Sequence, residues 1–266
     1  MRPLEIATGA RSWSTHEPQE LSPRSWEQLA RNEIPLIVLR GVATHAECAT
    51  LVARAASIGF AQYENVQPPI DRIGATVFEH NNTSMQSYFA EANRVRALQN
   101  EIFSKSFSPL ERFTSRMLSA LGRPVELASD PQHGNYYAGL VRRIENSTLL
   151  HIDYAPAEAP TWSIASVTSQ LAWNLYVELS DIGAGVTHVY NRPWQPADEA
   201  MKVPNTYGYE HALVAGAERI TFRPTLGDVY IFNTRNFHEV EASLGRRTTV
   251  TSAIGIEPEG DIVLWS

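Results

Sequence analysis

The stretch of sequence that decides the fold is Thr148-Leu149-Leu150-His151-Ile152-Asp153-Tyr154. Its β-branched and aromatic residues predict a β-strand. Residues two apart on a strand project to the same face, so His151 and Asp153 are placed to reach one ion. The alternative is a half-buried structural histidine beside a surface aspartate. The strand pattern favours a shared metal ion.

One histidine further along the chain completes a site of this kind. His238 lies in a short extended stretch, Asn236 to Val240, after a turn signal and an apolar run between Gly227 and Asn233. Two imidazoles and one carboxylate form the facial triad of non-haem Fe(II) oxygenases, which leaves coordination positions open. We therefore predict that His151, Asp153 and His238 bind Fe(II).

An arginine shortly after His238 suits a dicarboxylate cosubstrate, 2-oxoglutarate. Strand alternation places Arg247 and Thr249 on one face and leaves Arg246 on a solvated edge. A guanidinium pairs with a carboxylate through two hydrogen bonds, and a neighbouring hydroxyl completes the set. We predict that Arg247 and Thr249 bind the distal carboxylate, and that Asn174 bonds the keto acid end.

A second candidate motif, His45-Ala46-Glu47, is a decoy. Eight histidines and 29 acidic residues among 266 positions give about one such spacing by chance. Thr44 and Glu47 form a capping box at the start of a helix that runs to Ile58. Residues two apart on a helix point about 200° apart, so His45 and Glu47 cannot share a metal.

Composition limits the function further. The net charge of −7 argues against a nucleic-acid partner, since phosphate neutralisation needs a basic surface. A single cysteine, Cys48, excludes a disulfide framework and indicates a reducing cytoplasm. We see no membrane-spanning run and no signal-peptide core after Met1. We expect a small-molecule substrate, a cytoplasmic location, no membrane partner, and a monomer or homodimer.

The organisation along the chain predicts one domain over residues 1–266. Residues 1–130 are expected to give mainly helical support with one or more added strands, and residues 131–266 a β core. The expected helices are Ser22 to Ala30, Thr44 to Ile58, Ser84 to Phe103 and Ser108 to Leu121, and the expected first-half strand is Ile34 to Gly41. The expected core strands are Tyr136 to Arg143, Leu149 to Tyr154, Ser169 to Glu178, Val186 to Asn191, Glu218 to Arg223, Val229 to Asn233 and Thr248 to Ile256. Many short antiparallel strands indicate a sandwich or jelly roll. Long loops such as Pro193 to Tyr209 are often functional lids, and the alternative is a structural excursion.

Several runs resemble a small-molecule branch of the 2-oxoglutarate oxygenases. That branch includes the N-succinyl L-amino acid hydroxylases and the carrier-independent halogenases of indole alkaloid biosynthesis. The resemblance is carried by Tyr136–Arg143 (YYAGLVRR), Leu150–Pro156 (LHIDYAP), Gln170–Tyr176 (QLAWNLY), Lys202–Tyr209 (KVPNTYGY), Leu226–Asp228 (LGD) and Phe232–His238 (FNTRNFH). It covers roughly Asn135 to Ile256, whereas the helical first part is similar only in general layout.

This resemblance implies a double-stranded β-helix, a cupin-like jelly roll, and an enzyme that uses Fe(II), 2-oxoglutarate and O2. Halogenases of this kind have glycine two residues after the first histidine, which leaves a place for chloride. Here that position is Asp153, so the resemblance implies hydroxylation. The nearest resemblance also implies that the substrate is a free or N-acylated amino acid.

The residues leave other functions open. The candidates for the substrate pocket are Tyr137, Arg143, Trp162, Trp173, Lys202, Tyr207 and Tyr209, although aromatic residues more often pack in a core. Arg143 and Lys202 are the candidate anion contacts. The substrate could instead be an alkaloid or nucleoside-type metabolite. Jelly rolls also host metal-dependent isomerases and lyases and metal-free binders, which do not consume 2-oxoglutarate.

Overall fold

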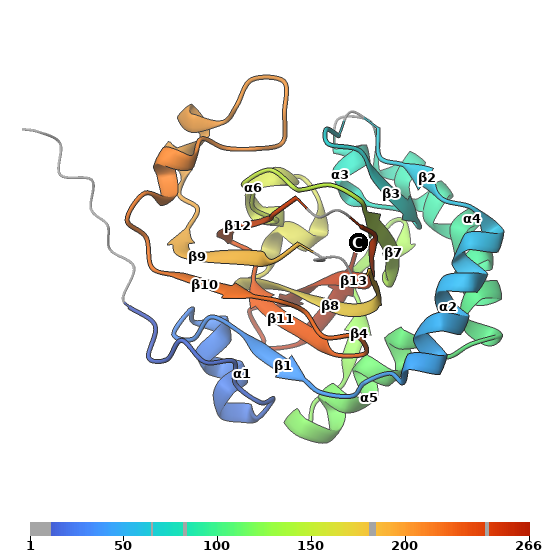
Figure 1. Ribbon diagram of the computed structural model, residues 1–266. Coiled ribbons are helices and arrows are strands. Elements are labelled where there is room, and N and C mark those ends of the chain that lie inside the picture. Colours follow the sequence, from blue (N-terminus) through green and yellow to red (C-terminus); the bar gives the residue numbers. More distant parts are fainter. Residues whose placement is uncertain (1–11, 65, 82–83, 181–184, 243–244) are drawn as a thin grey trace, which may run out of the picture.

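The computed structural model describes residues 12–64, 66–81, 84–180, 185–242 and 245–266 (Figure 1). The first eleven residues, which we expected to carry no signal peptide, lie outside these ranges. The helices are α1 (Pro23–Ala30), α2 (His45–Ile58), α3 (Val77–His80), α4 (Met85–Ser104), α5 (Pro109–Leu121) and α6 (Ala155–Glu158), with 3-10 turns at Ser163–Ser166, Pro196–Met201 and His211–Val214. Among these described helices, none is both long and apolar enough to cross a membrane.

A nine-stranded sheet is the main layer of the fold. Its main path runs β1-β11-β8-β13-β7-β3-β2, with β14 beside β13 and β4 beside β14. The strands of this sheet are β1 (Ile37–Leu39), β2 (Ala61–Gln62), β3 (Ile70–Ile73), β4 (Val125–Leu127), β7 (Leu140–Ile144), β8 (Ser169–Leu179), β11 (Val229–Asn233), β13 (Arg247–Ile256) and β14 (Ile262–Trp265). All pairs are antiparallel except β14 with β4.

A smaller antiparallel sheet, in the order β10-β9-β12, completes the jelly roll. Its strands are β9 (Thr187–Pro193), β10 (Arg219–Phe222) and β12 (Asn236–Val240), and a separate ribbon joins β5 (Ser129–Asp130) to β6 (Gly134–Asn135). Helices α2, α4 and α5 lie together on one side of the large sheet (Figure 1). The predicted jelly roll with N-terminal supporting helices is confirmed.

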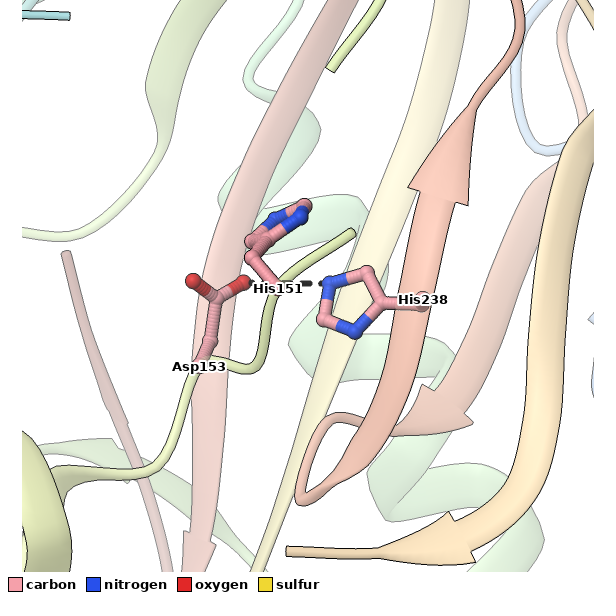
Figure 2. A group of neighbouring side chains, drawn as sticks. All are labelled: His151, Asp153 and His238. Atoms are coloured by element: carbon pink, nitrogen blue, oxygen red, sulfur yellow. Dashed lines mark ion pairs between the residues drawn. The ribbon is translucent and has the colours of Figure 1, made fainter. Parts of the chain in front are cut away.

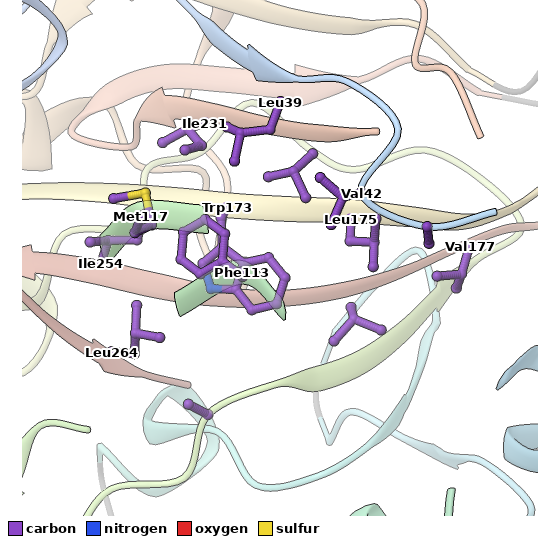
Figure 3. Close-up of a cluster of buried hydrophobic side chains, with 14 of the residues drawn as sticks. Leu39, Val42, Phe113, Met117, Trp173, Leu175, Val177, Ile231, Ile254 and Leu264 are labelled. Carbon is purple, nitrogen blue, oxygen red and sulfur yellow. The ribbon is translucent and has the colours of Figure 1, made fainter. Parts of the chain in front are cut away.

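Side-chain alternation on β8 separates the core from the pocket. Leu171, Trp173 and Leu175 belong to the main apolar core, whereas Ala172 and Asn174 line a pocket on the other face. Helix α5 contributes Phe113 to that core. Phe113 stacks on Trp173 with ring centroids 4.4 Å apart, in the cluster drawn in Figure 3. The same strand therefore builds the core and one wall of the pocket.

The helix starts agree with the capping signals. The Thr44 side chain accepts a hydrogen bond from the Glu47 backbone, and the Glu47 carboxylate accepts one from the Thr44 backbone. Glu47 also pairs with Arg112 at 2.8 Å, and His45 is exposed. The interpretation of His45-Ala46-Glu47 as a decoy is confirmed, because Glu47 is bound by Thr44 and Arg112 while His45 is exposed.

The prediction of a strand from Leu149 to Tyr154 is wrong. Only His151 pairs with β12, through a single bridge to His238. The Asp153 N–H donates to the carbonyl of Thr234, which lies in the turn before β12. The pairing with β12 therefore ends after one residue pair. The segment stays extended, which keeps His151 and Asp153 on one side. The prediction that the first core strand begins at Tyr136 is also wrong, because β7 begins at Leu140.

The sequence did not predict four of the strands in the large sheet. These are β2, β3, β4 and β14, which extend the sheet beyond β7 and β13. β3 pairs with β7, and β14 pairs with both β13 and β4. Because β1, β3 and β4 come from the first half of the chain, the two halves share one sheet. The helical half is therefore physically continuous with the half that carries the pocket.

Replacing Trp173 by alanine should lower the free energy of unfolding by about 3–5 kcal/mol, the usual cost of deleting a buried aromatic side chain. Trp173 is 0% exposed, and its ring lies on Phe113. Urea unfolding measures the change, and Leu118→Ala, at a position that is 50% exposed on α5, is the matched control. A loss of stability no larger than in the control, together with a loss of activity, would instead place Trp173 in the substrate site.

Candidate metal centre and cosubstrate site

His151, Asp153 and His238 form a compact group whose potential ligand atoms all lie within 4.8 Å of one another. His238 Nε2 is 3.5 Å from Asp153 Oδ2. Figure 2 shows His151 and Asp153 on one segment and His238 on β12, with the three side chains converging on a common space. Two imidazoles and one carboxylate in this arrangement match the donor set of a non-haem Fe(II) site.

Backbone pairing fixes the two histidines opposite each other. The His151 N–H donates to the His238 carbonyl at 3.0 Å, and the His238 N–H donates to the His151 carbonyl at 2.9 Å. The ring centroids are 4.2 Å apart. Asp153 is fixed by its own N–H, which donates to the Thr234 carbonyl at 3.0 Å. The positions of the three side chains therefore depend on the bridge between His151 and His238 and on the turn that contains Thr234.

Each imidazole is oriented through its Nδ1 atom. His151 Nδ1 lies 2.7 Å from the Leu149 carbonyl, and His238 Nδ1 lies 2.9 Å from the Asn236 carbonyl. A carbonyl oxygen only accepts, so both Nδ1 atoms carry the proton and both Nε2 atoms keep a lone pair. Such carbonyl contacts are the usual way in which a protein selects the tautomer of a metal-binding histidine.

The charges favour a cation at this point. Burial and the neighbouring His238 lower the pKa of His151 to about 4, so the ring is neutral and able to ligate at neutral pH. Burial alone would raise the pKa of Asp153, but the close approach of His238 and the nearby His151 and Arg142 lower it below its ordinary range. The Asp153 carboxylate and the neutral His151 imidazole thus coexist at neutral pH.

Arg247 is a buried guanidinium without an acidic partner. It is 3% exposed, and burial lowers the pKa of its side chain. Nη2 donates to the Tyr176 hydroxyl at 2.9 Å and Nη1 approaches the Gly185 carbonyl at 3.4 Å, while Nε has no partner. Within the described ranges no carboxylate lies within ion-pair distance of it. An uncompensated buried charge is costly, so this position calls for an anion.

Of the buried polar side chains Thr249, Thr187 and Asn174, the last two line the pocket and Thr249 does not. The Oγ1 atoms of Thr249 and Thr187 are buried without a protein partner in the part of the chain described. Asn174 is 3% exposed, and its Oδ1 accepts a 3.4 Å contact from Arg142 Nη2. One pocket between the two sheets is lined by His151, Asp153, Asn174, Thr187, His238 and Arg247. The three candidate metal ligands and the Arg247 guanidinium therefore face the same space.

Four of the seven predicted substrate residues lie away from this pocket. Tyr137, Trp162 and Trp173 are buried in apolar clusters. Arg143 lies over the Phe60 ring at 3.9 Å and near Glu178 at 3.7 Å, on the opposite face of β7 from the pocket. These placements correct the prediction, and the physical reason is strand alternation or core packing.

The other three predicted substrate residues belong to the segment 193–209, which packs against the His151 segment. The Tyr207 hydroxyl accepts from the Leu149 N–H at 2.9 Å, and its ring meets His151 edge-on at 5.5 Å. Tyr209 packs on Phe237, and Lys202 lies 4.0 Å from Glu199. None of these three is among the residues that line the described pocket. Tyr207 is the one in contact with a residue of the metal group.

Two charged residues of the pocket were missed in the sequence. Arg142 lines it from β7 and Glu158 from α6. Alternation along β7 could have identified Arg142, since Val141 and Arg143 share the opposite face. Glu158 carried no sequence signal of its own, because only the fold turns α6 toward the metal group.

The family comparison agrees with this geometry. Residues 16–259 match the family described as carrier-protein-independent halogenase WelO5. The chain belongs to this family. Leucinostatins biosynthesis cluster protein S of Purpureocillium lilacinum is 36% identical over 218 residues, covering 76% of this chain and 88% of that protein. The L-gamma-glutamyl-L-propargylglycine hydroxylase of Streptantibioticus cattleyicolor is 30% identical over 159 residues, covering 56% of this chain and 57% of the relative.

Solved structures agree on the fold of this WelO5-family chain. An N-substituted L-amino acid dioxygenase from Burkholderia ambifaria superposes with a TM-score of 0.62 at 17% identity, over 92% of this chain and 91% of that one. The same dioxygenase in complex with alpha-KG also gives a TM-score of 0.62. The double-stranded β-helix is confirmed. With its family, fold and His-Asp-His group, the chain is an iron- and 2-oxoglutarate-dependent oxygenase.

Proposed function

We propose that this enzyme hydroxylates an amino acid, free or N-acylated, and couples that reaction to decarboxylation of 2-oxoglutarate to succinate. One observation carries the proposal. The carboxylate of Asp153 stands with His151 and His238 in a pocket that also contains the unpaired guanidinium of Arg247. A carboxylate in that place supports hydroxylation over halogenation, since it occupies the position that a halide would need.

The proposed roles follow from donor chemistry. His151, Asp153 and His238 would hold the iron, which with 2-oxoglutarate and O2 supplies the oxidising power for a C–H bond. Arg247 and Thr249 would pair with the distal carboxylate of 2-oxoglutarate, and Asn174 would bond its keto acid end. We propose that the whole chain acts as one oxygenase domain in the cytoplasm, with the free Cys48 buried.

The names of similar proteins support an amino acid as the substrate. The relative from Streptantibioticus cattleyicolor hydroxylates an amino-acid derivative, and the Burkholderia ambifaria dioxygenase acts on N-substituted L-amino acids. An alkaloid or nucleoside-type metabolite is the second candidate. A screen of amino acids, N-acyl amino acids, indole alkaloids and nucleosides, with Fe(II), ascorbate and 2-oxoglutarate, tests the proposal. We expect an amino-acid product heavier by one oxygen atom and an equal amount of succinate. Oxidation confined to alkaloids or nucleosides would refute it.

Asp153→Gly tests the reaction outcome. The substitution removes one iron ligand and opens a position for a halide. We expect weaker Fe(II) binding, loss of most hydroxylation, and only traces of chlorinated product in high chloride. Efficient chlorination is not expected, because the outcome also depends on where the substrate carbon lies. Product analysis with and without chloride measures this, with Asp130→Gly, at an aspartate outside the pocket, as a control for the same change elsewhere. Full-rate hydroxylation by Asp153→Gly would show that Asp153 is not a ligand.

A further inference from the structure

We propose that the pocket recognises a free amino acid, with Glu158 binding the substrate ammonium group and Arg142 its carboxylate, and that it discriminates against N-acylated forms. This inference rests on the proposed function and narrows its substrate class. It concerns two ionisable side chains of the pocket, Glu158 and Arg142, to which the roles proposed above assign no ligand.

Glu158 is an acidic side chain that faces the pocket without a cationic partner. Its Oε2 accepts one hydrogen bond, from the Tyr154 N–H at 2.8 Å. No lysine, arginine or histidine lies within ion-pair distance of it among the described residues, and Lys202 lies against Glu199 instead. Burial and the charge of Asp153 raise the pKa of Glu158 to about 8. Burial and Asp153 thus disfavour the charged form of Glu158, and a cation supplied by the substrate would stabilise that form.

Arg142 is the corresponding cation on the facing sheet. Its only described hydrogen bond is the 3.4 Å contact to Asn174 Oδ1, and its Nε is buried without a partner. No described carboxylate lies within ion-pair distance. Its neighbour Arg143 differs, since it lies over Phe60 and near Glu178. Arg247 is the first residue of β13, and we assign it to the distal carboxylate of the cosubstrate. Arg142 lies on β7 opposite Thr249 and has no described anionic partner, so it is available to a second anion.

Both side chains line the pocket that contains the metal group. The charge of Arg142 helps to lower the pKa of Asp153, and the charge of Asp153 helps to raise that of Glu158. Apolar side chains, among them Leu140, Ile164 and Ala253, line the same pocket. A free amino acid with an aliphatic side chain offers one group for each charge and an apolar chain for the wall.

An N-acyl group removes half of this match. It converts the ammonium into a neutral amide, so Glu158 would face the pocket without a counter-charge. Leaving a buried charged or polar group unpaired is how a site rejects an analogue most strongly. Complementary charges on both sides of the substrate also set its orientation.

The experiment measures binding without turnover. Zn(II) replaces iron, 2-oxoglutarate is added, and calorimetry follows the binding of L-valine, L-leucine, L-norleucine and L-methionine, each beside its N-acetyl form. We expect at least one free amino acid to bind at least about tenfold more tightly than its N-acetyl form. Glu158→Gln should weaken the binding of the free amino acid at least about tenfold and leave the binding of the N-acetyl form unchanged. Arg142→Gln should weaken both forms, because both keep the carboxylate.

Two control variants match these changes. Glu210→Gln removes an exposed acid, and Arg143→Gln removes the arginine on the other face of β7. Both should bind as the wild type does. Unchanged 2-oxoglutarate binding by Glu158→Gln shows that this variant is folded. If 2-oxoglutarate fails to bind the wild-type Zn(II) protein, the proposed function itself is wrong.

With 2-oxoglutarate bound, three results would overturn this inference alone. The first is tighter binding of the N-acetyl forms than of the free amino acids, and the second is no binding of either set. The third is an Arg142→Gln variant that binds 2-oxoglutarate more weakly and binds the amino acid as the wild type does. That result would place Arg142 at the cosubstrate.

Discussion

Replacing His238 or His151 by alanine should abolish turnover and weaken Fe(II) binding by about a hundredfold or more. Each Nε2 faces the common space, and each ring is held there through Nδ1 by a backbone carbonyl. Altering even an outer-shell partner of a metal ligand typically costs about 10–100-fold in affinity or activity. Loss of a ligand should therefore cost at least the upper end of that range. Equilibrium dialysis with Fe(II) under argon measures the binding, and succinate formation measures the turnover.

His45→Ala is the matched control for these variants, since His45 is exposed at the start of α2 and belongs to the decoy motif. It should bind iron and turn over as the wild type does. Turnover near the wild-type level by either His151→Ala or His238→Ala at limiting iron would contradict the triad. The mutual bridge between these residues is made by backbone atoms, so alanine preserves it.

Arg247→Ala should raise the 2-oxoglutarate requirement about a hundredfold or more. Removing one partner of a buried charge pair costs about 3–5 kcal/mol, and each 1.4 kcal/mol is roughly a factor of ten. The side chain is 3% exposed and has no described acidic partner, so the cosubstrate would be its counter-ion. Calorimetric titration of the Zn(II) protein with 2-oxoglutarate measures the change directly.

Arg246→Ala is the natural control for the cosubstrate site. Arg246 is next in sequence, but its side chain is 57% exposed and lies 3.8 Å from Glu178. Such exposed pairs contribute little, so 2-oxoglutarate binding should be unchanged. The reverse ranking, with Arg246→Ala the damaging variant, would move the cosubstrate to the other face of β13 and refute our assignment. Arg247→Lys should recover only part of the affinity, since an ammonium cannot bind a carboxylate with two parallel hydrogen bonds.

The metal group was predictable because it depends on a short-range rule. An extended backbone places residues two apart on one side, and this holds for His151 and Asp153 although the segment makes only one bridge. Arg247 begins β13 and is buried on its pocket face, whereas Arg246 precedes the strand and is exposed. The capped helices α1, α2 and α5 were predictable for an equally local reason, the side-chain caps at Ser22, Thr44 and Ser108.

The substrate residues were less predictable, and one error was avoidable. Asn174 was expected to face the pocket, and alternation on the same strand then places Trp173 in the core. The same alternation on β7 places Arg142 in the pocket and Arg143 on the opposite face, over Phe60. Glu158 and the residues of α3 could not have been found, because their positions depend on contacts between distant segments. The Arg72 guanidinium, for example, is paired with Glu79 of α3 and with Glu91 of α4.

The most direct test of the central claim is a reaction under isotopically labelled O2, with Fe(II), 2-oxoglutarate, chloride and the amino acid that gives the largest substrate-dependent succinate formation. Our account predicts one labelled oxygen atom in succinate, one in the hydroxylated amino acid, and equal amounts of the two products. It also predicts that both disappear in His238→Ala. A mainly chlorinated product, or a changed substrate with 2-oxoglutarate left unconsumed, would contradict it.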